Sequence, residues 1–161
     1  DENGPEGDAI RQALKADIKE QEKLIASSGT LLGYRYEGSP IIVPDGTPEP
    51  PDDARKYVPV ARPGHRAPHV WLDDGQALFD RLGPGFTLLR IGLGAPDATP
   101  IIDAAAAAGM PLRVLELAEP MVAEVYDASL VLIRPDLMVA WRGTECPDDA
   151  VLVINTVRGA G

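Results

Sequence analysis

The stretch that decides the fold is FTLLRIGLGAPDATPIIDAAAAAGMPLRVLEL, residues 86–117. It opens and closes with apolar runs, residues 86–91 and 112–117, that have the length of buried strands. A helix is predicted between them over residues 100–108, and its five consecutive alanines favour close packing against a sheet. Because a helical crossover joins the two strands, we expect them to be parallel.

Further elements are predicted on both sides of this stretch, each bounded by glycine, proline or acidic residues. They are helices over residues 76–82 and 120–126, strands over 129–134 and 138–142, and a last helix that opens at 147–149 and runs through 157. The last segment is rich in β-branched side chains, so a strand is the alternative there. From residue 86 the order β-α-β-α-β-β-α predicts an α/β fold with a thioredoxin-like sheet, closed by an antiparallel hairpin.

Residues 1–52 are predicted to form an N-terminal arm before a domain at residues 53–161. The arm contains a helix predicted over residues 8–28 and ended by Gly29. Its apolar side chains form a narrow stripe, so we expect this helix to pack on a surface outside its own neighbourhood. The start DENGPEG, residues 1–7, has the composition of a tail or a cut edge, and the chain is expected to be a piece of a longer protein.

Two short strands are predicted in the rest of the arm, over residues 30–36 and 41–43. The segment PDGTPEPPDD that follows, residues 44–53, holds four prolines and four acidic residues. Because so polar a segment buries little apolar surface, we expect it to be an extended or mobile linker.

Charge and composition exclude several classes of partner. The 161 residues carry a formal net charge of −10, which disfavours a nucleic-acid or anionic-membrane partner, because phosphate binding needs clustered lysine and arginine. No window is long and apolar enough for a membrane span, so no membrane partner is expected. One cysteine cannot form an internal disulfide, and a reducing, cytoplasmic location is predicted.

A glycine-rich loop follows the first strand of the deciding stretch. Gly92 and Gly94 begin a dinucleotide-binding fingerprint, and Glu116 ends the next strand, where a ribose ligand would lie. The third glycine of the fingerprint is replaced by Asp97, whose carboxylate would face a pyrophosphate. A plain turn is therefore the favoured interpretation, and a nucleotide site is the alternative.

The cysteine does not fit thioredoxin chemistry. A redox site of that kind needs Cys-x-x-Cys at the start of the first helix of the sheet domain, where the helix dipole lowers a thiol pKa. The corresponding segment, residues 95–100, contains no cysteine, and Cys146 precedes the last helix. The fold prediction therefore comes without the redox activity.

The segment RPGHRAPH, residues 62–69, gathers both histidines of the chain with two arginines. His65 and His69 have the spacing of a helical metal pair, but the prolines and the glycine disfavour a helix and no third ligand is near, so no metal site is predicted. Arg62 and Arg66 are expected to bind backbone carbonyls or carboxylates across an interface, and contact with an anion or another ligand is the alternative. We interpret the segment as a rigid joint.

Several short segments occur along the chain in a definite order. They are GYRY at residues 33–36 with SP at 39–40, PGHRAPHVWL at 63–72, LFD at 78–80, FTLL at 86–89, RPD at 134–136 and VAWRG at 139–143. Together they resemble the C-terminal part of the FAD-dependent aromatic-ring hydroxylases, the phenol hydroxylase-like and 3-(3-hydroxyphenyl)propionate hydroxylase-like monooxygenases. The resemblance extends over roughly residues 8–160.

The resemblance implies a parent enzyme that hydroxylates a phenolic or related ring with FAD, NAD(P)H and O₂. It implies that the catalytic and flavin-binding residues lie upstream, so that this chain carries no catalytic, cofactor-binding or metal-binding residue. Its work would be structural, packing on the flavin and substrate domains of the parent and, as a further expectation, on a second subunit of a homodimer. The candidate interface residues are Tyr34, Tyr36, Arg62, Arg66, His69 and Trp71.

Two alternatives remain open on sequence grounds. The chain would act as an independent thioredoxin-like binding module, or as a small nucleotide- or methyl-donor-dependent enzyme that uses Gly92, Gly94 and Glu116.

Overall fold

The computed structural model of the chain describes residues 12, 14–15, 18, 28–36 and 38–160. Most of the helix predicted over residues 8–28 therefore lies outside the described residues. The chain divides into two compact units, one that combines the residues up to Gly33 with Pro50–Val58 and one that combines Tyr34–Glu49 with Pro59–Gly161. The predicted domain boundary near residue 52 stays a prediction.

A four-stranded sheet forms the centre of the second unit. Its strands are β1 at Phe86–Ile91, β2 at Leu112–Leu117, β3 at Leu130–Ile133 and β4 at Val139–Gly143. They lie in the order β2-β1-β3-β4, with β1 parallel to β2 and β3 antiparallel to both β1 and β4. The predicted strands are confirmed to within a residue at each end, as are the parallel pair and the closing hairpin.

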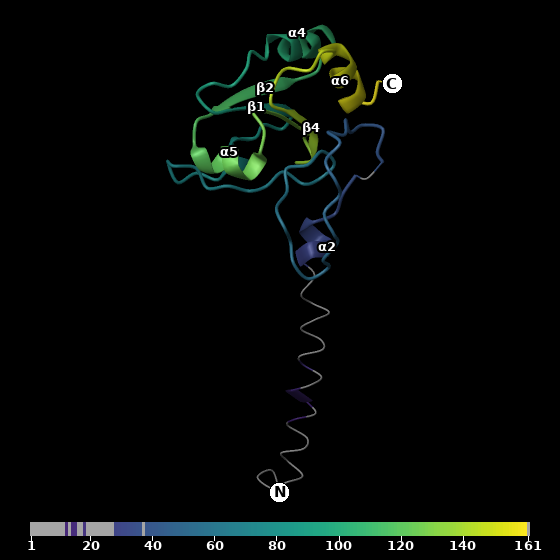
Figure 1. Ribbon diagram of the computed structural model, residues 1–161, viewed down its shortest axis with the longest axis vertical. Coiled ribbons are helices and arrows are strands. Elements are labelled where there is room, and N and C mark those ends of the chain that lie inside the picture. The colour runs from purple at the N-terminus through teal and green to yellow at the C-terminus, as the bar shows by residue number, and fades with distance from the viewer. Residues whose placement is uncertain (1–11, 13, 16–17, 19–27, 37, 161) are drawn as a thin grey trace, which may run out of the picture. The chain divides into compact units, whose positions relative to one another are not determined.

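Helices cover both faces of this sheet, because successive side chains of a strand point to opposite faces (Figure 1). The helices are α3 at Leu78–Arg81, α4 at Thr99–Ala107, α5 at Pro120–Tyr126 and α6 at Ala150–Val157. On one face Leu88 packs with α4 and α6, and on the other Leu89 packs with α3 and α5. No helix among the described residues has the length and apolar character needed to cross a bilayer.

The element order from Phe86 is the predicted β-α-β-α-β-β-α, and the mixed α/β class is confirmed. The closer likeness to thioredoxin stays a prediction. The last segment is a helix, so the alternative of a strand is wrong there. Asp149 begins that helix by accepting a hydrogen bond from the backbone N–H of Leu152 at 2.8 Å.

The strand predicted over residues 30–36 is wrong. The first unit contains α2 at Ser28–Leu32, so Gly29 lies inside a helix and does not end one. A Cβ atom at Gly29 would come within 1.7 Å of the backbone oxygen of Asp53. The glycine therefore serves the close approach of residues 53–54. Within the predicted strand, Arg35 forms an isolated β-bridge with His65, and Tyr36 donates its N–H to Gly64.

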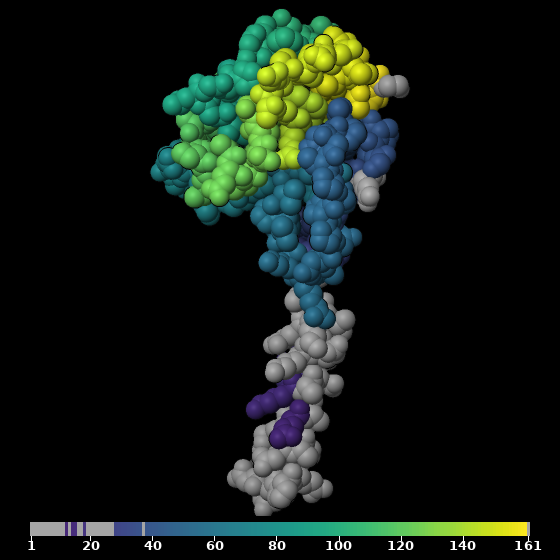
Figure 2. Space-filling view, in the orientation of Figure 1, coloured from purple at the N-terminus to yellow at the C-terminus, as the bar shows by residue number. Residues whose placement is uncertain are grey.

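The strand predicted over residues 41–43 is also wrong. Pro40 and Pro44 flank this segment and have no backbone N–H to pair. Val43 nevertheless donates one backbone hydrogen bond of 2.9 Å to Ala140 in β4, while Ile42 and Val43 pack against the apolar cluster under α4 and α6. Figure 2 shows this blue segment beside the yellow C-terminal elements of the same unit.

Part of the segment of residues 62–69 pairs with the chain at the start of β4. The N–H of Gly64 donates to Val139 at 2.8 Å, the N–H of Val139 donates to His65 at 2.9 Å, and Ala67 donates to Leu137 at 2.8 Å. Tyr36 then donates its N–H to Gly64 at 2.8 Å. Three pieces of chain that are distant in sequence are thus joined side by side through their backbones.

Gly64 combines a φ of +88° with a close approach of another segment, because a Cβ atom there would lie 3.3 Å from the backbone oxygen of Tyr36. Gly64→Ala is therefore expected to destabilise the protein by about 2 kcal/mol, through backbone strain and contact together. The control is Gly75→Ala, where φ is +79° and nothing lies within 4 Å, so only the strain of about 1 kcal/mol remains. Urea unfolding measures both; equal losses would show that the approach of Tyr36 carries no cost.

Candidate functional site

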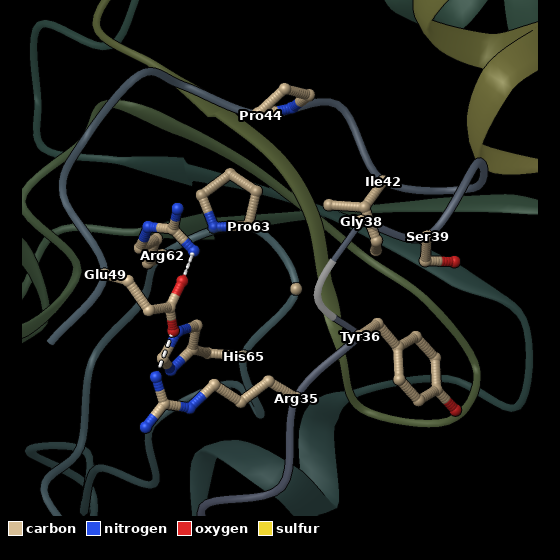
Figure 3. Close-up of a pocket in the computed structure, with 11 residues that line it drawn as sticks. Arg35, Tyr36, Gly38, Ser39, Ile42, Pro44, Glu49, Arg62, Pro63 and His65 are labelled. Carbon is tan, nitrogen blue, oxygen red and sulfur yellow. Dashed lines mark hydrogen bonds and ion pairs between the residues drawn. The ribbon is translucent and has the colours of Figure 1, made fainter. Parts of the chain in front are cut away.

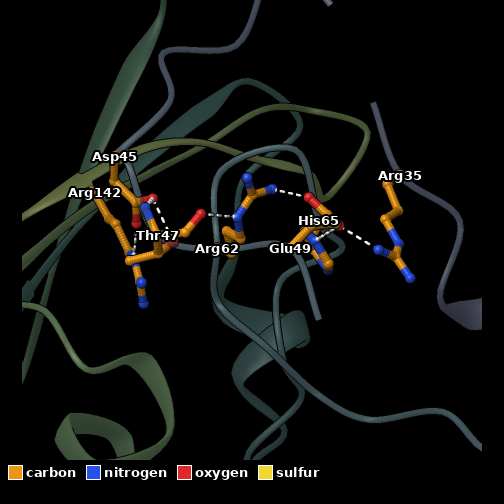
Figure 4. Close-up of polar contacts among 7 residues, drawn as sticks. All are labelled: Arg35, Asp45, Thr47, Glu49, Arg62, His65 and Arg142. Atoms are coloured by element: carbon orange, nitrogen blue, oxygen red, sulfur yellow. Dashed lines mark hydrogen bonds and ion pairs between the residues drawn. The ribbon is translucent and has the colours of Figure 1, made fainter. Parts of the chain in front are cut away.

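A single carboxylate contacts three basic side chains in the second unit (Figure 4). Glu49 accepts a hydrogen bond from Arg35 on Oε1 and from Arg62 on Oε2, and the Nε2 atom of His65 lies 2.8 Å from Oε1. We call these four residues the Glu49 cluster. They come from three separate segments that the backbone bonds along β4 bring together.

Burial and the two arginines set the charge states in the Glu49 cluster. Burial works to raise the pKa of the Glu49 carboxyl, but hydrogen bonds from Arg35 and His65 and the charge of Arg62 outweigh it and lower that pKa below its usual 4.5. Burial lowers the pKa of His65 below 6.5, against the opposing attraction of Glu49. At neutral pH Glu49 is therefore a carboxylate, and the neutral ring of His65 donates its Nε2–H to it.

A second carboxylate continues the same polar chain. Asp45 accepts hydrogen bonds from the hydroxyl of Thr47 at 2.5 Å and from Nε of Arg142 in β4 at 2.6 Å. The Nε of Arg62 donates to the backbone oxygen of Thr47 at 3.0 Å, which links the two carboxylates. The segment 44–49 has no helix or strand, as expected of a linker, yet its side chains fix it to the sheet.

A cavity of about 300 Å³ lies beside the Glu49 cluster (Figure 3). It is lined by Arg35, Tyr36, Gly38, Ser39, Ile42, Pro44, Glu49, Arg62, Pro63, Gly64 and His65. In the close-up the phenol ring of Tyr36 points away from Glu49, and its hydroxyl donates to Asp136 at 3.2 Å. The charged groups of the cavity are therefore all on the side of the Glu49 cluster.

The remaining sequence-predicted residues gather elsewhere. The rings of His69 and Trp71 lie 5.1 Å apart, edge to face, and the ring of Phe79 lies 5.2 Å from His69. Arg66 places its guanidinium 5.3 Å from the centre of the Phe79 ring, a cation–π contact. Because Trp71 is 66% exposed, these four residues form an aromatic surface, which we call the Trp71 surface.

Tyr34 and Tyr36 lie together, with ring centres 6.3 Å apart, and Tyr34 is 44% exposed. Of the six candidate interface residues, only Arg62 belongs to the Glu49 cluster. His65 and His69 lie in different groups, so the structure does not bring the two histidines together. The interface role of the six residues stays a prediction.

Sequence reasoning missed Glu49, because it lies in a proline-rich segment whose composition is typical of a linker. Its acidic neighbours in that segment give no sign of which carboxylate is held. The only signal was indirect: two arginines in a rigid loop were expected to bind carboxylates, and Arg62 does bind one.

The loop after β1 is filled by its own side chains. Arg90 donates to the backbone oxygens of Ala95 and Pro96 and pairs with Glu116 at 2.5 Å. Asp97 accepts hydrogen bonds from the N–H and the hydroxyl of Thr99 at the start of α4. The loop therefore does not fit a pyrophosphate, and the plain-turn interpretation is favoured.

Cys146 lies partly buried against the apolar cluster under α4 and α6. Burial raises the pKa of its thiol, whereas a thiolate nucleophile needs a lowered pKa. The geometry therefore favours a packing role for this side chain.

Comparison with known proteins points to one family. The family described as "Aromatic-ring hydroxylase, C-terminal" matches residues 60–159. The FAD-dependent monooxygenase apdD of Emericella nidulans is 40% identical over 150 residues, which cover 88% of this chain and 24% of that protein. The 2,4-dichlorophenol 6-monooxygenase of Delftia acidovorans is 33% identical over 159 residues, covering 88% and 27%. The chain thus spans about a quarter of the length of these relatives.

Solved structures contain the same fold. The native and K252c-bound RebC-10x superposes with a TM-score of 0.83 at 33% identity, over 99% of this chain and 30% of that one. A ternary complex of aklavinone-11 hydroxylase with FAD and aklavinone superposes with a TM-score of 0.63 at 33% identity, over 81% and 27%.

Glu49→Gln is expected to lower the free energy of unfolding by about 1–3 kcal/mol, because it removes the negative charge to which the guanidinium groups of Arg35 and Arg62 donate. Equilibrium unfolding in urea measures the loss. The matched control is Glu124→Gln on the exposed face of α5, which should stay within about 0.5 kcal/mol of the wild type. Equal effects of the two substitutions would contradict a stabilising role of the Glu49 cluster.

Acidification is expected to lower the free energy of unfolding through the protonation of His65. Because the folded-state pKa of His65 lies below 6.5, the unfolded chain takes up the proton first as the pH falls. The stability that comes from a neutral His65 is thus complete above pH 6.5 and is lost as the pH falls below it. His65→Gln should flatten the rise of the free energy of unfolding between about pH 5 and pH 7. A wild type that gains stability on acidification through this range would refute the assignment.

Proposed function

Because the chain belongs to the aromatic-ring hydroxylases and matches their C-terminal domain over residues 60–159, we propose that it is the structural C-terminal domain of a larger flavoprotein. That parent uses FAD and NAD(P)H to hydroxylate a phenolic or related aromatic ring. The match to the C-terminal domain is the observation that carries the proposal. The names of the relatives support the chemistry of the parent, since they include a phenol 2-monooxygenase and FAD-dependent monooxygenases.

The chemistry of the described residues supports a structural role. The carboxylates of Glu49 and Asp45 are each bound by arginine, so neither is poised to move a proton. The loop after β1 does not fit the pyrophosphate of a dinucleotide, and the Cys146 thiol does not favour its thiolate. The role proposed for Glu49 and Asp45 is to hold the segment 34–49 against the sheet.

The Trp71 surface is the contact that we propose for the flavin and substrate domains of the parent. Exposed tryptophan beside arginine and histidine is typical of the centre of a protein interface, where aromatic residues and arginine are enriched. Tyr34 and Tyr36 are proposed to extend this contact. A homodimer contact of the parent and a cytoplasmic location belong to the same proposal.

Titration of the purified chain with FAD tests the cofactor part. The expected result is no saturable change in flavin absorbance or fluorescence, because the proposed flavin site lies in another domain. Yellow FAD that co-purifies with this chain, or hydroxylation of phenol by this chain with NADH, would overturn the structural assignment. Saturable binding of NADH or S-adenosylmethionine would instead support the nucleotide-dependent alternative. An independent binding module would bind none of FAD, NADH and S-adenosylmethionine.

Trp71→Ala in the parent hydroxylase tests the interface. We expect the variant to lower the melting temperature of the parent by several degrees and to lower that of the isolated chain much less, because truncation of an interface tryptophan costs roughly 2 kcal/mol or more. The control is Leu152→Ala on α6, a side chain that is 62% exposed and lies outside the Trp71 surface. If Trp71→Ala lowers the melting temperature of the parent no more than Leu152→Ala does, or no more than it lowers that of the isolated chain, Trp71 is not an interface residue.

A further inference from the structure

The Glu49 cluster has the form of a ligand site whose ligand belongs to the chain itself. Both oxygens of the carboxylate are bound, Oε1 by Arg35 and His65 and Oε2 by Arg62 (Figure 4). The backbone of His65 accepts a hydrogen bond from Val139 of β4, Arg35 forms a β-bridge with His65, and the backbone oxygen of Arg62 accepts from the N–H of His65, whereas no backbone hydrogen bond ties Glu49 itself to these residues in the part of the chain that the structure describes. The donors are therefore positioned by the fold, and the carboxylate is brought to them.

An empty site of this kind would attract an anion strongly. The side chains of Arg35 and Arg62 are only 15% and 20% exposed, so water screens their charges poorly once Glu49 is removed. The planar guanidinium fork matches a carboxylate, which gives the site a preference among anions. Glu49 itself is 27% exposed and borders the cavity of about 300 Å³, so a small solute can reach the same position from solvent.

We propose that Arg35, Arg62 and His65 form a carboxylate-binding site that Glu49 occupies as a tethered ligand, and that formate or acetate binds there when the Glu49 side chain is removed. The tether is short, because Asp45, four positions earlier, is bound to Arg142. The effective concentration of the Glu49 carboxylate is therefore high, and free carboxylates do not displace it in the wild type. The proposal is independent of the function proposed for the parent.

Chemical rescue of Glu49→Ala tests the site. The variant is expected to melt several degrees below the wild type, and formate or acetate should restore at least half of that loss with saturation in the millimolar range. Acetamide, which has the shape of acetate without its charge, and sodium chloride at the same ionic strength should restore none of it. The wild type should not respond to acetate beyond its response to chloride.

The chain provides a local reporter, since it has only two histidines. In Glu49→Ala the imidazole NMR signals of His65 should shift from their wild-type positions and return toward them as acetate is added, with the same midpoint as the thermal rescue. The double variant Glu49→Ala/Arg62→Ala should lose both responses, because the partner of Oε2 is gone.

Glu49→Ser serves if Glu49→Ala does not fold, because its hydroxyl still accepts a hydrogen bond from an arginine and its short side chain leaves room for acetate. A saturable, carboxylate-specific response of the melting temperature and of His65 in either variant supports the proposal. A response that acetamide or chloride reproduces, or no saturable response in a folded variant, overturns it. If neither variant folds even in molar acetate, the site does not accept a carboxylate from solution and the proposal fails as well.

Discussion

Backbone pairing at the start of β4 is the constraint on which the site in the second unit depends. Residues 64–67 bond to residues 137–139, and Tyr36 continues the pairing from Gly64. This pairing fixes the backbone of His65 and, through an isolated bridge, that of Arg35, and a turn hydrogen bond from His65 to Arg62 places the third donor beside them. Ordering three long polar side chains around one carboxylate costs conformational entropy, and a fixed backbone removes part of that cost in advance. The electrostatics of the Glu49 cluster are thus a consequence of hydrogen bonding in the main chain.

The net charge of −10 makes the distribution of arginine informative. In the described residues Arg35, Arg62 and Arg142 are each committed to a carboxylate of the segment 44–49. Arg66, by contrast, lies over the ring of Phe79. Two neighbouring arginines of one sequence motif therefore serve different surfaces: Arg62 holds a segment of its own unit, and Arg66 supports the exposed aromatic group around Trp71. The rigid joint predicted for residues 62–69 stays a prediction; in the structure this loop carries one arginine of each surface.

Local patterns were sufficient for the sheet and insufficient for the segment before it. The run at Phe86–Ile91 and the proline that begins α5 each specify their element from neighbouring residues alone, and the structure agrees with both. Gly29 misled the prediction because glycine ends helices and also permits a close approach, and only the position of Asp53 distinguishes the two. Glu49 was missed for a related reason: its partners lie 13 to 16 positions away, on both sides of the proline-rich segment that contains it. Periodicity carries no information about such contacts.

The covering of β4 has a consequence for assembly. A sheet edge with free N–H and C=O groups is a template on which strands of other molecules can add. In the native chain residues 64–67 pair with residues 137–139 and so cover the first residue of β4, while Val43 donates to Ala140, the second. Residues 64–67 are held there partly by the side chain of Glu49, in a segment that has no regular structure. The other edge strand, β2, carries the charged residues Arg113 and Glu116 on its exposed positions. The contacts that form the Glu49 cluster therefore also help to protect the start of β4 from intermolecular β-pairing. This protection depends on the segment 44–49 staying in place.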